Sequence, residues 1–177
     1  MSLAMTVEER QAFLAQVHVA VVAVAGEDGR APLAVPVWYD YRPGGEVSLI
    51  TERDSRKTTL IRRAGRITLC VQGTELPYQY ASAEGPITAI EDTVTVEQRW
   101  AIASRYLGPE GADAYIESTP GATERMVRIL MRPEHWLTRD YTKIVQLAGP
   151  VRRRRAGRRT YRRSLQHRLV GSTVAAR

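Results

Sequence analysis

Several features that would place a protein in a special class are missing from this sequence. Its 177 residues include a single cysteine, Cys70, so no disulfide can form within the chain, and we expect a reducing, cytoplasmic environment. The longest apolar stretch, residues 19–25, is far shorter than the roughly 20 residues that cross a bilayer. The first ten residues contain Glu8 and Glu9 and no long apolar run, which argues against a secretion signal.

The short motifs of the large enzyme classes are also missing. The sequence contains no glycine-rich nucleotide loop, no paired-cysteine or HExxH metal motif and no nucleophile elbow. The three histidines, His18, His135 and His167, are isolated from one another along the chain, so we expect no metal site. Acyl transfer and metal-assisted hydrolysis are therefore not indicated.

Acidic residues are missing from one end of the chain. The whole chain carries +7, yet residues 1–150 carry −3, because residues 151–177 hold ten arginines and no acidic residue. We therefore divide the chain into a domain at 1–150 and an arginine-rich tail at 151–177, which we expect to be unstructured. Eight arginines between Arg152 and Arg163 could neutralise nucleic-acid phosphates. Only one aromatic residue, Tyr161, lies among them, so they predict no sequence-specific binding.

The elements that are present indicate a mainly β fold. Strands are predicted at residues 18–25, 32–41, 46–51, 66–72, 78–91 and 124–137, and helices at 6–17, 55–64, 95–107 and 112–117. Turn signals at 26–29 and 42–45 join the first three strands as hairpins. A doubly wound sheet would need a helix after nearly every strand, so this order predicts an antiparallel β-barrel with a few peripheral helices.

Three positions within these elements carry extra information. Pro36 lies inside a predicted strand, which implies an edge strand or a bulge. Gly85-Pro86 predicts a bend in the long strand at 78–91. Trp100 falls on an apolar helical stripe with Val96, Ala103 and Leu107, so we expect it to pack in the core.

The start of the predicted helix at 55–64 concentrates groups that bind anions. Ser55, Arg56 and Lys57 form its first turn, directly after a strand. A helix N-terminus offers free backbone N–H groups and the positive end of the helix dipole, and a hydroxyl, a guanidinium and an ammonium there suit a phosphate monoester. A capped surface helix with solvated basic residues is the other interpretation, although cations at this end oppose the dipole.

Residues 51–57, Thr-Glu-Arg-Asp-Ser-Arg-Lys, resemble the T-N-x-x-S-R-K motif of the pyridoxamine 5'-phosphate oxidase family, which lies between the same two strands. The resemblance extends over about residues 13–138 and implies the FMN-binding split β-barrel of that family. It also implies that Ile50 and Thr51, at the strand end, contact the flavin. Arg56 and Lys57, beside Ser55, would hold its phosphate.

The same resemblance implies further cofactor-binding residues. The segment 33–39 is similar to the strand that lines the isoalloxazine ring in the family. It assigns four residues to the cofactor: Val35, Pro36, Val37 and Trp38. Tyr80 falls where members of the family place a glutamine against the cofactor. Trp38 and Tyr80 could equally be aromatic filling of a barrel interior.

The departures from the family narrow the expected activity. The carboxy-terminal Arg-Leu segment that recognises pyridoxamine phosphate is replaced here by residues 136–140, so we do not expect that activity. The P-V-W-Y-D-Y strand is more similar to the actinobacterial branch that uses the deazaflavin coenzyme F-420. Arg62, Arg63 and Arg66 could line a groove for the oligoglutamate tail of that coenzyme, or they could form a solvated helix face.

The resemblance therefore implies an oxidoreductase that transfers a hydride between FMN or F-420 and a small organic substrate. It implies a homodimer with the cofactor at the subunit interface, and the cofactor would supply the reactive chemistry. A protein that binds or carries a flavin or haem without catalysis is the alternative. A histidine acting as axial ligand would favour haem.

Overall fold

The computed structural model describes residues 2–147, so the predicted tail at 151–177 and its boundary lie outside the described part. The helices are α1 (Val7–Ala15), α2 (Arg56–Ala64), α3 (Val96–Glu117) and α4 (Thr142–Leu147), with a 3-10 turn η1 (Ala122–Arg125). The strands are β1 (Ala20–Val24), β2 (Leu33–Val37), β3 (Asp40–Tyr41), β4 (Val47–Glu52), β5 (Arg66–Gln72), β6 (Gln79–Glu91), β7 (Met126–Met131) and β8 (His135–Asp140).

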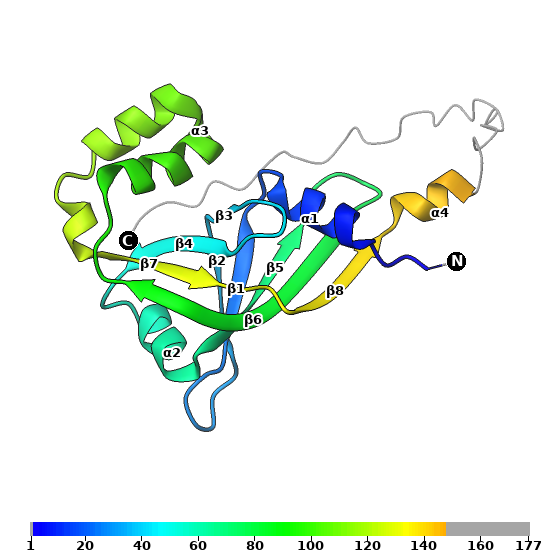
Figure 1. The fold of residues 1–177 in the computed structure, drawn as a ribbon, viewed down its shortest axis with the longest axis horizontal. Helices are drawn as coiled ribbons and strands as arrows, with labels where there is room; N and C mark the ends of the chain where they lie inside the picture. Colours follow the sequence, from blue (N-terminus) through cyan, green and yellow to red (C-terminus); the bar gives the residue numbers. More distant parts are fainter. Residues whose placement is uncertain (1, 148–177) are drawn as a thin grey trace, which may run out of the picture.

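The strands form one curled antiparallel sheet, which confirms the predicted fold class of a mainly β split barrel with peripheral helices (Figure 1). Its order is β2-β1-β5-β6-β7-β4-β3, and β8 pairs with β6. In the view of Figure 1, α3 lies above and α2 below the strands β4 and β7. None of the described helices is long and apolar enough to cross a membrane.

The long strand β6 holds the two halves of the sheet together. Its first half pairs with β5 on one side and β8 on the other, and its second half pairs with β7. The register with β7 is interrupted between Ile87 and Ala89, next to the predicted bend at Gly85-Pro86. A Cβ on Gly85 would lie 1.7 Å from the carbonyl oxygen of Arg132, so only glycine lets the chain after β7 pass this close to β6.

That crossing corrects one prediction. The single strand expected at 124–137 is two strands, β7 and β8, because the chain leaves the ladder at Arg132-Pro133-Glu134 to pass over Gly85. The single strand expected at 32–41 is likewise divided into β2 and β3. There, the backbone N–H of Tyr39 donates to the hydroxyl of Tyr106 at 3.0 Å instead of to a neighbouring strand.

The core lies on the concave side of the sheet. Strand β5 alternates as predicted, with Ile67, Leu69 and Val71 buried. Helix α2 adds Leu60 and Ile61, and it ends as predicted at Gly65, which has a left-handed φ of 63°. Each large apolar side chain buried in this way contributes about 1.5–3 kcal/mol. The core therefore anchors α2 and fixes where its first turn lies.

Helix α3 departs from the predicted stripe. It continues through a kink at Gly108, and its buried residues include Arg99, Ile102 and Ala103. Trp100, expected in the core, is only partly buried, and its indole N–H donates to Asp113 at 2.7 Å. The indole therefore joins the two halves of the kinked helix. The buried position belongs to the neighbouring arginine.

Candidate functional site

The barrel is open along a split between β2 and β4. Strand β2 pairs only with β1 in the described part of the chain, which confirms the edge position expected from Pro36. On the other side of the split, β3 pairs with the first two residues of β4, so Leu49–Glu52 have no strand neighbour there. The segments expected to bind a cofactor thus border the same opening.

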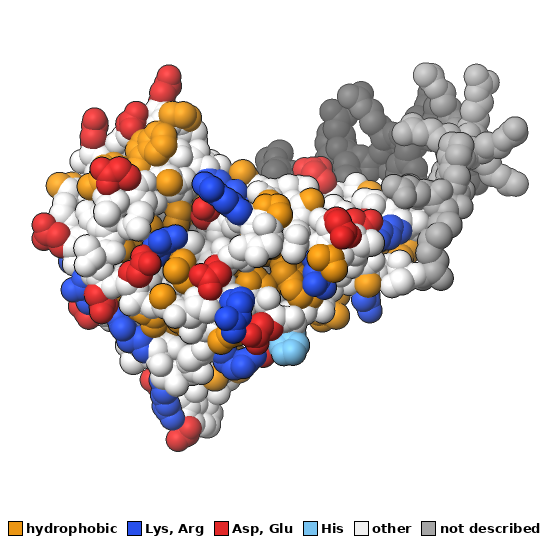
Figure 2. All heavy atoms as spheres, in the orientation of Figure 1, with side chains coloured by type: hydrophobic (Ala, Val, Ile, Leu, Met, Phe, Trp, Pro, Cys, Tyr) orange, Lys and Arg blue, Asp and Glu red, His pale blue; other side chains and the backbone are white. Residues whose placement is uncertain are grey.

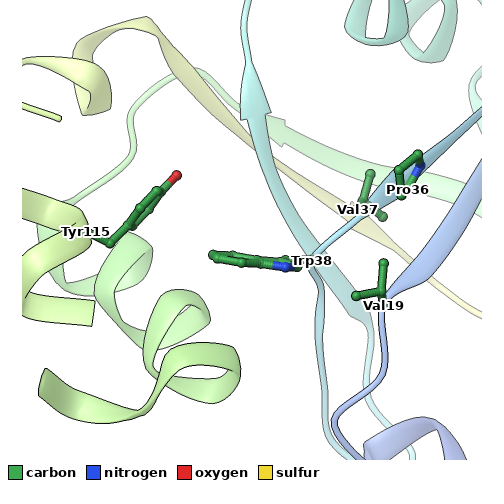
Figure 3. Close-up of a pocket in the computed structure, with 5 residues that line it drawn as sticks. All are labelled: Val19, Pro36, Val37, Trp38 and Tyr115. Atoms are coloured by element: carbon green, nitrogen blue, oxygen red, sulfur yellow. The ribbon is translucent and has the colours of Figure 1, made fainter. Parts of the chain in front are cut away.

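A cavity of about 460 Å³ lies at the end of β2, and its walls are mainly apolar. It is lined by Val19, Pro36, Val37, Trp38 and Tyr115. Figure 3 shows the indole of Trp38 extending away from the strand toward Tyr115, with Val19, Pro36 and Val37 on the strand side. A flat apolar ring is the kind of group that such walls accept.

The indole of Trp38 is held in place by α3. Its ring stacks on Tyr106 with a centroid distance of 4.9 Å and an interplanar angle of 7°. The Tyr106 hydroxyl accepts the N–H of Tyr39 at 3.0 Å and donates to the carbonyl of His18 at 2.8 Å. Burial raises the pKa of Tyr106, so its hydroxyl remains a donor. Tyr106 therefore fixes Trp38 and occupies one face of the indole.

A second, smaller cavity of about 50 Å³ adjoins the first and shares Trp38 and Tyr115 with it. Its other lining residues are Ile50, Arg99, Ile102, Ala103 and Met126. Arg99 is the only charged residue among them and is 4% exposed. Its guanidinium carbon lies 4.8 Å from the centre of the Tyr115 ring.

The first turn of α2 has the geometry that the sequence predicted. Ser55 is the N-cap, and its hydroxyl accepts the N–H of Thr58 at 3.3 Å. The hydroxyl of Thr58 in turn donates to the carbonyl of Glu52 at 2.7 Å, which ties the helix to the end of β4. No acidic residue lies in this first turn. The positive end of the helix dipole therefore faces two basic side chains and no acid within the turn.

Arg56 and Lys57 differ in their surroundings. The guanidinium of Arg56 lies 3.2 Å from the carboxylate of Glu27, in the loop between β1 and β2, and both side chains are about half exposed. Lys57 is partly buried, and within the described part of the chain no carboxylate lies within 4.0 Å of its ammonium. Burial lowers the pKa of Lys57, an effect that the more distant Glu52 partly offsets.

The arginines that follow on α2 and β5 are all paired. Arg62 contacts Asp92 at 2.6 Å, Arg63 contacts Asp28 at 3.5 Å and Arg66 contacts Glu84 at 2.9 Å. Figure 2 likewise shows acidic and basic side chains next to each other on the face it displays. Each of these three arginines is thus partly exposed beside a carboxylate, an arrangement compatible with either interpretation.

The structure brings together only some of the residues that the sequence singled out. Pro36, Val37 and Trp38 line the larger cavity, and Ile50 lines the smaller one. Val35 packs against the core, and Thr51, next to Ile50, is 8% exposed. Ser55 begins α2 five residues after Ile50, so β4 links the aromatic cavities to the basic helix start.

Tyr80 lies elsewhere in the protomer. It sits on β6 opposite Gln72 and Arg139, and three strand spacings separate β6 from β2. At about 4.8 Å a spacing, the path along the sheet from Tyr80 to β2, which ends one residue before Trp38, is roughly 14 Å. Within one protomer Tyr80 is therefore not part of the Trp38 cavity.

Sequence reasoning missed three residues of this region: Arg99, Tyr106 and Tyr115. All three come from α3, whose predicted inward stripe pointed to Trp100 instead. Only Arg99 left a signal in the sequence, as a charged residue next to an apolar stripe. That signal is indistinguishable from an ordinary surface arginine until the helix is packed.

The sequence profile of the pyridoxamine 5'-phosphate oxidase family matches residues 6–140, so the chain belongs to this family. Among curated proteins, none matches this sequence closely enough to indicate a relationship.

Solved structures share the fold at low sequence identity. One named F420 reductase is 20% identical, with a TM-score of 0.62 over 72% of this chain and 94% of that one. A conserved hypothetical protein from Mycobacterium tuberculosis is 20% identical, with a TM-score of 0.65 over 98% and 96% of the two chains. An FAD and haem binding protein from Mycobacterium smegmatis is 16% identical, with a TM-score of 0.53 over 84% and 80%.

Proposed function

We propose that this protein is a flavin- or deazaflavin-dependent oxidoreductase that transfers a hydride between bound FMN or F-420 and a small organic substrate. One observation carries the proposal: the partly buried, unpaired Lys57 lies at a helix start that β4 connects to an aromatic cavity. This combination fits a ligand with a phosphate at one end and a flat ring at the other. A fold neighbour named F420 reductase supports the deazaflavin alternative.

The phosphate would bind at the first turn of α2. It would accept hydrogen bonds from Lys57 and from the backbone N–H groups of that turn. Its negative charge would also stabilise the Lys57 ammonium, which burial destabilises. Arg56 would bind the phosphate in place of Glu27. Its surface pair with Glu27 contributes less than about 1 kcal/mol, so breaking it costs little. Ser55 keeps its capping role and orients the turn.

The ring would lie in the split, against Ile50, Thr51 and the segment Val35–Trp38. Tyr106 already covers one face of Trp38, so a ligand would contact the remaining face and edge of the indole. When bound, the cofactor supplies the hydride chemistry. The protein's own part is to hold the ring, exclude water from the apolar walls and position the substrate over it.

The proposal also includes a cytoplasmic homodimer, whose interface would lie on the convex face of the sheet. The row Pro36–Val21–Cys70–Ser82–Leu137 crosses five strands on the convex side of the sheet. Within this row, Val21 is 41% and Leu137 is 56% exposed. A second copy covering this face would bury the row, and the partner's Tyr80 could then reach the cavity that the protomer's own Tyr80 does not.

The dimer is tested by placing a charge in the exposed row. We expect Val21→Glu to convert a dimer into a monomer in analytical ultracentrifugation, because the carboxylate would be buried without a partner. Thr59→Glu, on the exposed face of α2, serves as the control and should leave the sedimentation coefficient unchanged. A wild-type protein that sediments as a monomer at all concentrations would contradict this part.

The cofactor is tested by titrating FMN and F-420 separately into the full-length protein. We expect tight binding of one of them, weakened at least about tenfold by Lys57→Ala, which corresponds to about 1.4 kcal/mol. Lys143→Ala is the matched control, because Lys143 is the chain's other lysine and pairs with Glu9 at 2.6 Å on another part of the molecule. If neither cofactor binds, the proposal is wrong.

A non-catalytic flavin or haem carrier is the second candidate. The fold neighbour that binds FAD and haem favours it. In the described part of the chain, no histidine lines either cavity, so the axial ligand of a haem would have to come from elsewhere. A haem absorption band in the purified protein would support the carrier. Turnover of the bound cofactor with an added hydride donor would support the enzyme.

A further inference from the structure

Arg99 is a buried cation without an acidic partner. Its side chain is 4% exposed, and its two terminal nitrogens donate to the carbonyl and the hydroxyl of Thr119, which are both neutral groups. No carboxylate of the described residues lies within 4.0 Å of its guanidinium, and its Nε has no hydrogen-bond partner. The face of Tyr115 provides its remaining contact.

This arrangement is costly in the free protein. A buried ionised group without an opposite charge is strongly unfavourable, and an unpaired buried donor adds to that cost. Among the described residues, three other arginines also have a buried Nε without a hydrogen-bond partner, but their surroundings differ. Arg105 lies 3.7 Å from Asp40, whereas Arg10 and Arg53 are partly exposed, so water screens their charge. Arg99 therefore stands out among them.

The cavity beside Arg99 has the size of a small anionic group. Its volume of about 50 Å³ exceeds the roughly 15 Å³ that one water needs, and it is far too small for a ring system. Apart from Arg99 and the two aromatic residues, its walls are Ile50, Ile102, Ala103 and Met126, which offer no polar side chain to such a group. The guanidinium is the only charged group in this lining, and the Tyr115 hydroxyl and the Trp38 indole N–H are the neutral donors beside it.

The two cavities together describe a ligand. They share Trp38 and Tyr115, so a molecule can fill the 460 Å³ cavity with a flat body and place a substituent in the smaller one. We propose that Arg99 binds the carboxylate of the substrate, and that the substrate is a small planar carboxylic acid whose body lies against Trp38. The inference rests on the proposed function in one respect, because it assigns this acid to the reaction with the cofactor.

Benzoate and benzamide are suitable probes, because they differ in charge and hardly in shape. In the full-length protein at pH 7.5 we expect benzoate to bind at least about tenfold more tightly than benzamide. Tryptophan fluorescence measures the binding of both probes. Arg99→Met should remove this preference, and Arg99→Lys should keep part of it. Arg132→Met is the control, because Arg132 is exposed and pairs with Glu134 at 3.0 Å, so the preference should persist.

A second readout follows the Arg99 side chain itself. With ¹⁵N-arginine labelling, benzoate should shift the Nε–Hε resonance that is absent from Arg99→Met, and benzamide should not. If Arg99→Met does not fold, the wild-type preference and a single shifted Nε–Hε signal decide. Equal affinities for the two probes, or an unshifted Arg99 signal, would overturn the proposal.

The source of the carboxylate is tested by repeating the benzoate titration on protein saturated with the cofactor that binds. Retained benzoate affinity supports a substrate site. Competition with F-420 would mean that Arg99 binds the coenzyme's own carboxylates, which overturns the assignment to substrate. If neither cofactor binds while benzoate still prefers wild type over Arg99→Met, the anion site stands and only the proposed function fails.

Discussion

The arginines around α2 and Arg99 on α3 have opposite surroundings. Around α2, the arginines at 56, 62, 63 and 66 are at least partly exposed, and each lies within 3.5 Å of a carboxylate. Arg99, on α3, is 4% exposed, and its hydrogen-bond partners within the described residues are neutral groups of Thr119. A charge in water can be paired or solvated at little cost, whereas a buried one cannot.

The contrast separates cations that have a carboxylate partner from cations that have none. Each α2 arginine has to give up a surface carboxylate before it can bind a ligand, so their clustering in the sequence does not by itself indicate a binding site. Among the described residues, neither Lys57, in the same turn as Arg56, nor the buried Arg99 has a carboxylate within 4.0 Å. In the proposal these two cations lie at the two ends of the site, where Lys57 holds the cofactor phosphate and Arg99 holds the substrate carboxylate.

The largest expected effect separates Lys57 from its neighbour Arg56. We expect Lys57→Met to weaken cofactor binding at least about tenfold, or about 1.4 kcal/mol. Arg56→Met should weaken it about threefold, because Arg56 has to give up Glu27 before it can bind the phosphate. Isothermal titration calorimetry measures both. Equal losses in the two variants would remove the distinction between paired and unpaired cations.

The free energy of unfolding provides the next test. Replacing an unpaired buried charge with an apolar side chain should destabilise the protein less than replacing a paired charge. We expect Arg99→Met, which keeps the side-chain volume, to raise the free energy of unfolding by about 1 kcal/mol. Arg62→Met, which breaks the surface contact with Asp92, should lower it by less than about 1 kcal/mol. Urea unfolding followed by circular dichroism measures both. A loss of several kcal/mol in Arg99→Met would indicate that its bonds to Thr119 are structural.

The pH dependence of cofactor binding tests Lys57 in the unmodified protein. Burial lowers its pKa below the usual 10.5, so as the pH rises through that lowered pKa the ammonium is lost and the affinity for the phosphate falls. The free protein changes in the opposite direction, since its stability rises as the cost of the buried charge disappears. Fluorescence titrations between about pH 7.5 and 10 measure the affinity. Lys57→Arg, which stays charged, should show no decline over this range.

The smallest expected effect concerns the surface pair itself. Glu27→Gln releases Arg56, so we expect the affinity for the cofactor phosphate to rise about twofold, or about 0.5 kcal/mol. The gain should shrink with added salt, because exposed charges are screened. Asp28→Asn, which releases Arg63 at the neighbouring position, is the control and should leave the affinity unchanged. A drop in affinity on releasing Arg56 would contradict its place in the phosphate site.

Much of the fold could be predicted because the patterns involved are local. The alternation of Ile67, Leu69 and Val71, the cap at Ser55 and the left-handed stop at Gly65 each depend on a few neighbouring residues. The division of residues 124–137 into two strands could not be predicted, because its cause is the contact between Arg132 and Gly85, which are far apart in sequence.

The candidate site divides in the same way. The sequence by itself determined the antiparallel architecture, the capped α2 and the placement of Ser55, Arg56 and Lys57 in its first turn, since these follow from periodicity and capping chemistry. Only the tertiary structure decided which cations are neutralised, because the acids that pair with the arginines come from other elements. It also decided that α3 turns Arg99 inward beside Trp38, because burial depends on what packs against a helix, which its own sequence does not contain.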